Sequence, residues 1–142
     1  FDEHILLVHE CCMNEEGMRA VKNVMKNAYI ALCPCSNIFI HNALPPIDLM
    51  RKEGMRLTIG TDSLSSNDDL DMVREMFCIQ ENFPDVPLGE IISWATRNGA
   101  EFLGKGDVYG RLARGFKPGV AVIDHIDKEG RLTTASKSIR II

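Results

Sequence analysis

Ala28-Tyr29-Ile30-Ala31-Leu32-Cys33, which is followed directly by Pro34, is the stretch that indicates the fold class. Its residues are apolar at consecutive positions, a pattern typical of a strand that is buried on both faces of a sheet. Proline then ends the strand, because its nitrogen carries no hydrogen to donate to a neighbouring strand. Residues 4–9 are a further apolar run of this kind, and residues 55–59 are predicted to form a third strand. The sequence therefore predicts three strands, the first two of them buried.

Helices are predicted between these strands. Residues 14–26 carry apolar side chains at helical spacing, and Asn14 is a suitable N-cap residue for them. A second helix is predicted to start at the proline pair 45–46 and to end at Gly54, since proline is tolerated in a first helical turn and glycine favours a helix end. The polar residues 35–37 are expected to open a loop before this helix.

Further helices are predicted after the third strand. We expect Asp68 or Asp69 to cap a helix over residues 69–82, with Leu70 on its apolar face, and a further helix over 88–103 that is broken near residue 98. Strands that alternate with helices indicate an α/β fold with a parallel sheet.

Beyond Gly104 the sequence predicts a small appended sheet. Residues 120–123 and 132–142 have the pattern of strands, and a turn is expected at residues 127–130.

The composition is that of a folded globular domain, and it excludes several classes of protein. The chain has 142 residues, 45% of them hydrophobic and 25% charged, with a net charge of -4. Its apolar content is too high for disorder, it has no run of about 18 apolar residues that could span a membrane, and its acidic balance argues against nucleic-acid binding. The five cysteines do not form a disulfide framework, and no signal peptide is evident, so we expect reduced thiols and a cytoplasmic protein.

Candidate functional residues follow each predicted strand. In parallel α/β folds, functional groups lie at the carboxyl ends of the strands. Those ends are His9, residues 33–37 and residues 61–63. His9 and Asp62 could form a metal site or an acid–base pair; alternatively, they cap a strand and a turn.

The cysteines offer a different metal site. A zinc site of thiolates would combine Cys11 and Cys12 with Cys33 and Cys35. Structural zinc sites favour two or more residues between paired cysteines, and neither pair has that spacing, so buried or incidental thiols are the preferred interpretation.

Several short strings occur in an order that resembles one family. They are ILLVH (5–9), ALCPCSN (31–37), IGTDS (59–63) with Ser66-Asn67, WATRNGA (94–100) and GFKPGVA (115–121). Together they resemble the carboxyl-terminal part of metal-dependent amidohydrolases of the aminohydrolase and chlorohydrolase branch, which includes deaminases of guanine, S-adenosylhomocysteine and methylthioadenosine. The resemblance implies a partial (β/α)8 TIM barrel, with these strands as barrel strands six to eight. Residues 1–109 would belong to the barrel, and residues 110–142 would supply β strands of a small composite sandwich.

The resemblance also implies a reaction and roles for residues. The family uses one divalent metal, zinc or alternatively iron, to activate the water that displaces an amino group, or chloride, from a small purine-like or other heteroaromatic substrate. Asp62 would be the metal ligand and proton shuttle, and His9 would either polarise the substrate by donating a hydrogen bond or orient the metal-bound hydroxide. The remaining candidates are substrate-binding residues: Cys35, Ser36, Asn37 and Ser63. Ser36 and Asn37 could instead cap a turn, and Ser63 is expected to support Asp62 through a hydrogen bond.

The sequence departs from the family pattern in its metal ligands. The family places a His-x-His on strand one and a further histidine on strand five, but the four histidines here, at positions 4, 9, 41 and 125, form no such motif. We therefore expect an inactive carboxyl-terminal fragment of a longer hydrolase, which contains no metal by itself and either self-associates or pairs with its missing barrel half. The alternative is a non-catalytic α/β binding module derived from the same fold.

Overall fold

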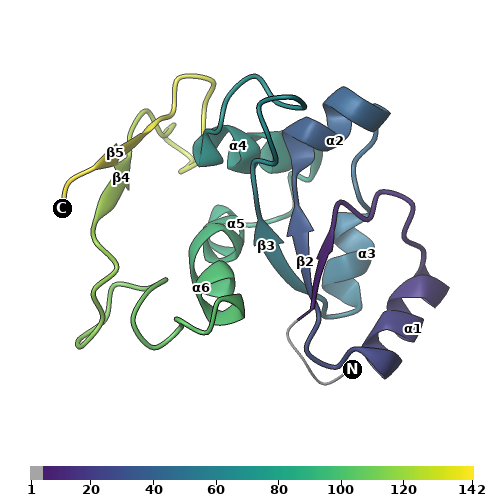
Figure 1. The fold of residues 1–142 in the computed structure, drawn as a ribbon. Coiled ribbons are helices and arrows are strands. Elements are labelled where there is room, and N and C mark those ends of the chain that lie inside the picture. Colours follow the sequence, from purple (N-terminus) through teal and green to yellow (C-terminus); the bar gives the residue numbers. More distant parts are fainter. Residues whose placement is uncertain (1–4) are drawn as a thin grey trace. The chain divides into compact units, whose positions relative to one another are not determined.

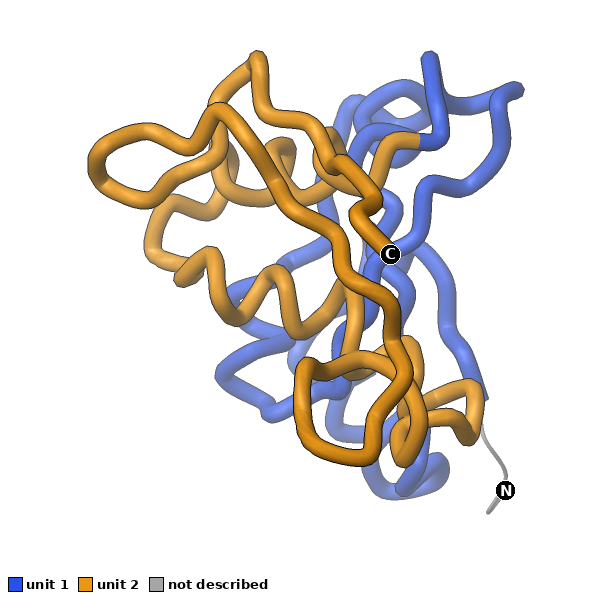
Figure 2. Tube along the Cα trace, turned by 90° about the vertical axis from the view of Figure 1, so that its left-hand side faces the viewer, with its two compact units in different colours: residues 1–70 blue, residues 71–142 orange. Residues whose placement is uncertain are grey.

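The computed structural model describes residues 5–142 and divides the chain into two units, residues 1–70 and 71–142 (Figure 2). His4, with which the first predicted strand begins, lies outside the described residues. The two units are not the predicted domains 1–109 and 110–142, which refer to the barrel and sandwich of a longer protein; that boundary stays a prediction. No helix within residues 5–142 combines the length and apolarity needed to cross a membrane.

A parallel three-stranded sheet forms the centre of the first unit (Figure 1). Its strands are β1 (Leu6–Val8), β2 (Tyr29–Leu32) and β3 (Arg56–Ile59), in the order β1-β2-β3. The register pairs Val8 with Ala31 and Ala31 with Thr58, so the three carboxyl ends lie at the same edge of the sheet. The prediction of three parallel strands is confirmed.

The burial predicted for the strands holds for β2 and fails for β1. Every residue of β2 is buried between its two neighbours. In β1, however, Leu6 and Val8 are 38% and 44% exposed. Both β1 and β3 are edge strands of the described sheet, but Leu57, Thr58 and Ile59 of β3 are buried, so edge position alone does not account for the exposure of β1.

Two helices of the first unit form where they are predicted. Helix α1 (Glu15–Val24) begins after Asn14, whose side chain accepts a 2.8 Å hydrogen bond from the backbone nitrogen of Gly17. Helix α3 (Ile47–Lys52) follows the proline pair and ends before Gly54, which has a φ of +66°. Such a left-handed residue closes a helix at little cost when it is glycine.

Helix α2 (Pro34–His41) corrects the predicted loop at residues 35–37. Pro34 occupies the start of this helix, where its missing N–H has no helical acceptor in any case and its fixed φ suits the helix. The helix ends at Asn42 in the left-handed conformation. As a consequence, Ser36 and Asn37 lie in a first helical turn, and both are buried.

In the second unit, helix α4 (Met72–Asn82) starts later than predicted. Its N-cap is Asp71, whose carboxylate accepts a 2.8 Å hydrogen bond from the Val73 backbone, and not Asp68 or Asp69. Leu70 consequently precedes the helix and is exposed instead of lying on its apolar face.

The predicted break near residue 98 is a change of helical pitch. Helix α5 (Leu88–Ser93) continues into a π-helical segment, η1 (Trp94–Asn98), and then into α6 (Gly99–Phe102). The residues at both junctions keep right-handed helical dihedral angles, so the chain widens its turn without leaving the helix.

The carboxyl-terminal sheet is smaller than predicted. Strands β4 (Ala121–Ile123) and β5 (Ser138–Arg140) pair antiparallel. The predicted strand over 132–142 is shortened because residues before β5 bond elsewhere: the Leu132 backbone bonds to the side chain of Gln80, and Thr133 and Ser136 form a turn. The expected turn at residues 127–130 is confirmed by a hydrogen bond from Gly130 nitrogen to the Asp127 carbonyl.

Candidate functional site

Four of the candidate side chains meet at the carboxyl edge of the parallel sheet. His9 directly follows β1, Ser36 and Asn37 lie in the first turn of α2 after β2, and Asp62 follows β3. Hydrogen bonds of 2.6 and 2.7 Å join Ser36 to Asp62 and Asn37 to His9. The topology therefore assembles one polar cluster from three separate segments.

Asp62 is the centre of this cluster. Its Oδ2 accepts hydrogen bonds from Ser36 Oγ at 2.6 Å and from Ser66 Oγ at 2.9 Å. The Ser36 hydroxyl, followed by that of Ser66, lowers the pKa of the Asp62 carboxyl below its ordinary value, and the nearby His9 adds to this effect. The side chain of Asp62 is 30% exposed. At neutral pH the site thus presents an accessible carboxylate anion.

His9 lies beside the Asp62 carboxylate, and its ring nitrogen Nδ1 is in hydrogen-bonding contact with Asn37. Nε2 of His9 is 3.8 Å from Oδ2 of Asp62, while Nδ1 is 2.7 Å from Oδ1 of Asn37. The backbone nitrogen of His9 donates to the Ala31 carbonyl and so extends the β1–β2 pairing by one residue. The imidazole is therefore oriented through Nδ1 by Asn37, while Nε2 lies near the carboxylate without a hydrogen bond to it.

The backbone at both candidate catalytic residues is left-handed. His9 has a φ of 72° and Asp62 a φ of 57°, values that residues other than glycine adopt rarely. In the loop that holds Asp62, the side-chain nitrogen of Asn67 donates a 2.8 Å hydrogen bond to the Thr61 carbonyl. Unusual backbone conformations that the surroundings enforce are concentrated at functional sites.

Of the other two candidates, Ser63 lies differently from what the sequence predicted, whereas the substrate-binding role of Cys35 stays a prediction. The Ser63 hydroxyl is exposed and pairs with Ser65 Oγ at 2.6 Å, although the Ser63 backbone contributes to the lowered pKa of Asp62. The hydroxyls that support Asp62 are those of Ser36 and Ser66. Cys35 is half-buried beside them in the first turn of α2.

Ser66 is the residue for which the sequence offered no role. Its only signal was its position four residues after Asp62, within the strings that carried the family resemblance. A hydroxyl at that spacing reaches back to the carboxylate because the chain turns at the left-handed Asp62.

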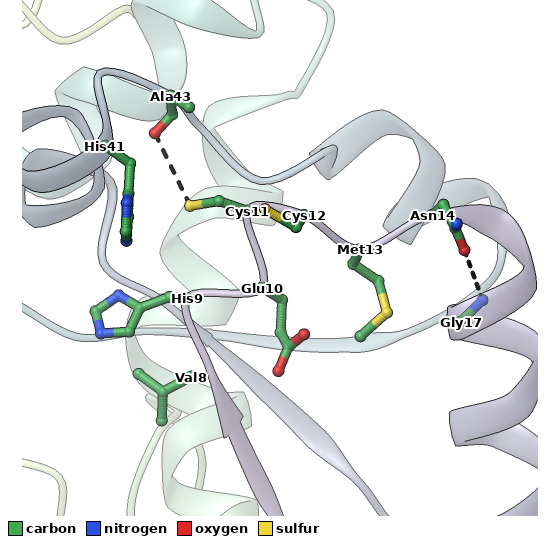
Figure 3. A pocket seen from close by; sticks show the side chains of 10 residues that line it. All are labelled: Val8, His9, Glu10, Cys11, Cys12, Met13, Asn14, Gly17, His41 and Ala43. Atoms are coloured by element: carbon green, nitrogen blue, oxygen red, sulfur yellow. Dashed lines mark hydrogen bonds between the residues drawn. The ribbon is translucent and has the colours of Figure 1, made fainter.

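A pocket opens beside His9 (Figure 3). His9 and His41 lie at one end of it, and Asn14 lies at the other. Between them the loop after β1 contributes Glu10 and the adjacent thiols Cys11 and Cys12. This part of the site is hollow and has both polar and thiol groups on its walls.

Asp62 and His9 have the donor atoms for part of a metal site. A carboxylate and an imidazole are both ligands for divalent zinc and iron, and catalytic zinc uses about three protein ligands. Within residues 5–142, no three His, Cys, Asp or Glu side chains are grouped so that they could hold a metal ion. The cysteines accordingly form no thiolate site in this part of the chain, and the donor set of Asp62 and His9 fits a metal that has further ligands.

Comparisons with known proteins point to one family. The model of the Amidohydrolase family matches residues 1–140. An adenosine deaminase of Helicobacter pylori is 32% identical over 105 residues, which are 72% of this chain and 26% of that protein. A 5-methylthioadenosine/S-adenosylhomocysteine deaminase of Syntrophomonas wolfei is 31% identical over 136 residues, 91% of this chain and 31% of that protein.

A solved structure shows the same likeness in three dimensions. The crystal structure of an adenosine deaminase from Xanthomonas campestris with bound zinc has a TM-score of 0.73 and 25% identity, and the match covers 84% of this chain and 28% of that one. The chain thus spans between a quarter and a third of the length of these relatives.

Proposed function

Since the chain belongs to the amidohydrolase family, we propose that it supplies the Asp62 and His9 end of the active site of a metal-dependent hydrolase. The reaction is the removal of an amino group from a purine-like or other small heteroaromatic ring. The observation that carries this proposal is the pair itself: an anionic, partly exposed carboxylate lies 3.8 Å from an oriented imidazole at the carboxyl edge of parallel strands.

The fold proposed for the complete protein is the (β/α)8 barrel. Strands β1, β2 and β3 would be barrel strands six, seven and eight, and residues 110–142 would complete a small sandwich. This assignment is supported by the parallel order of the three strands and by the match to the family over residues 1–140. It also agrees with the antiparallel pairing of β4 and β5 after the helices.

Asp62 would transfer a proton in this reaction. Its carboxylate takes a proton from the attacking water, whose oxygen forms a bond to the ring carbon that bears the amino group. The same proton then passes to the departing nitrogen, the carbon–nitrogen bond breaks, and ammonia leaves while the carbon keeps the oxygen. The hydroxyls of Ser36 and Ser66 keep the carboxyl ionised and fix its orientation.

The metal ligand in this chain would be Asp62. A bound divalent cation lowers the pKa of water toward about 7, which makes hydroxide available at neutral pH. Zinc is our first choice, supported by the zinc-bound relative from Xanthomonas campestris, and iron is the alternative. We propose that the other ligands come from histidines outside these 142 residues, so that this chain alone is inactive.

Pairing with the rest of a barrel would cover the exposed edge of the sheet. Leu6 and Val8 of β1 are apolar and more than a third exposed, and an unpaired strand edge readily takes up another strand. We therefore propose that the chain pairs with a complementary barrel half or, without one, with a second copy of itself.

Asp62→Asn is the variant that tests the proposed function. It keeps the shape of the side chain and removes the anion that would bind metal and move protons. In the whole protein, purified with its metal, the variant should release no ammonia from adenosine, methylthioadenosine or S-adenosylhomocysteine at a level above background, while its circular dichroism is unchanged. Ser63→Ala is the matched control, since that hydroxyl faces solvent, and it should keep most of the activity.

Retained turnover in the Asp62→Asn variant would overturn the role assigned to this residue. A protein that binds purine-like compounds without metal and without turnover would instead be the non-catalytic binding module.

A further inference from the structure

Asn37 is a fully buried polar residue whose two side-chain ends differ in their surroundings. It is 0% exposed in the first turn of α2. Its Oδ1 lies 2.7 Å from Nδ1 of His9, whereas its Nδ2 has no hydrogen-bond partner among residues 5–142. A buried amide nitrogen without an acceptor is unusual, because buried donors are nearly always paired. Within the described part of the chain, the contact with His9 is therefore the side-chain hydrogen bond that orients this amide.

With Oδ1 of Asn37 directed at the ring, the contact favours one of the two tautomers of a neutral His9. A carbonyl oxygen only accepts hydrogen bonds, and a neutral imidazole has one N–H and one lone pair. At 2.7 Å, a lone pair on Nδ1 would repel the oxygen of Asn37, whereas an N–H at Nδ1 makes a good hydrogen bond. Nε2 gains no comparable bond, since its 3.8 Å separation from Asp62 Oδ2 exceeds hydrogen-bonding distance.

We propose that Asn37 is a positioning residue that fixes neutral His9 in the Nδ1–H tautomer and directs the lone pair of Nε2 toward the side of Asp62. His9 then accepts a proton or hydrogen bond at the reacting centre and can donate there only after it has gained a proton. This reverses the first of the two roles expected from the sequence, in which His9 polarises the substrate as a donor. The inference rests on the proposed function, because it gives His9 its part in that site.

The test reads the tautomer directly and needs neither metal nor turnover. In the 15N-labelled chain of 142 residues, two-bond proton–nitrogen correlation spectra distinguish the protonated from the unprotonated ring nitrogen. They are recorded at about pH 8.5, two units above the ordinary histidine pKa of about 6.5. His9 should show its proton on Nδ1. His41, exposed at the end of α2, is the internal reference and should show the tautomer mixture of a free side chain, in which Nε2–H predominates.

Two variants distinguish the effect of the Asn37 carbonyl from an effect on folding. Asn37→Leu removes the acceptor, so the proton of His9 should move to Nε2, while Asn37→Asp keeps an acceptor oxygen and should keep a proton on Nδ1. The inference is overturned if wild-type His9 carries its proton on Nε2, as it would if the amide presented its nitrogen to the ring. It is equally overturned if Asn37→Leu leaves the proton on Nδ1.

If Asn37→Leu does not fold, the spectra of the wild type and of Asn37→Asp still show which nitrogen of His9 carries the proton. A failed tautomer test leaves the ammonia assay of Asp62→Asn unaffected, so the two proposals can fail separately.

Discussion

Replacing Ser36 with alanine removes the hydroxyl that donates the shorter of the two hydrogen bonds to Oδ2 of Asp62. The bond is 2.6 Å long, Ser36 is fully buried, and its acceptor is ionised. Hydrogen bonds to charged groups contribute about 1.5–3 kcal/mol to stability. Because the Asp62 side chain is 30% exposed, water can replace part of the lost bond, so we expect a loss near the lower limit, about 1.5 kcal/mol at pH 7.

The same substitution should change how stability depends on pH. The pKa of Asp62 is lowered in the folded chain, chiefly by Ser36, so its ionised form stabilises the fold above the pKa of the unfolded chain, about 4. This contribution is lost as the pH falls through the lower pKa of the folded state. Without Ser36 the folded pKa moves back toward its ordinary value. The loss of folding stability caused by Ser36→Ala is therefore largest at neutral pH and becomes smaller below about pH 4.

Urea unfolding of the wild type and of Ser36→Ala, followed by circular dichroism between pH 7 and pH 3, measures this cost. Ser63→Ala is the control, because its hydroxyl pairs with exposed Ser65 and its loss should cost less than about 0.5 kcal/mol. A cost for Ser36→Ala as small as that of the control at pH 7, or one that stays the same down to pH 3, would refute the reasoning.

Two further predictions concern the N-cap of α1 and a buried contact within the second unit. Asn14→Ala removes the N-cap bond to Gly17 and should cost about 1 kcal/mol in urea unfolding; no loss would mean that α1 does not depend on this cap. Gln80→Leu deprives the buried backbone of Leu132 of a donor and an acceptor, at 3.0 and 2.8 Å, and should cost about 2–4 kcal/mol. Asn82→Ala, which loses only exposed bonds to Cys78, should stay within about 0.5 kcal/mol. An equal loss of stability in the Gln80 and Asn82 variants would contradict the assigned difference.

The sequence was sufficient to predict the sheet and the principal pair of the site. Continuous apolar runs determine where buried strands form, and parallel strands bring their carboxyl ends to the same edge. For that reason His9 and Asp62 could be placed near one another without a structure, and the 3.8 Å between their side chains agrees with this prediction.

Supporting residues were harder to assign, because their roles depend on distant partners. Ser36 bonds to Asp62 across 26 positions and Asn37 bonds to His9 across 28 positions. Locally, three polar residues after a proline resemble a loop, whereas in the structure Pro34 starts a helix that presents two of them to neighbouring strands. The side chains thus hold the catalytic candidates in place, a role for which the local sequence gives no signal.

The cap of α4 shows a different limit. Asp68, Asp69 and Asp71 have the same tendency to cap a helix, so the sequence alone could not single out Asp71, which the structure shows as the cap. Likewise, the apolar run of β1 alone could not reveal the exposure of Leu6 and Val8.

The most direct test of the central claim, that Asp62 is a metal ligand, is to locate a bound cation on the chain. Mn2+ is the suitable probe, because it prefers carboxylate to thiolate and broadens the resonances of nearby nuclei even when binding is weak. In 15N-labelled chain titrated with Mn2+, the signals of His9, Asp62 and Ser66 should broaden first. Asp62→Asn should abolish this pattern, whereas Asp48→Asn, at an exposed position in α3, should not. Broadening that spreads evenly over the surface carboxylates, or that persists in Asp62→Asn, would contradict the claim.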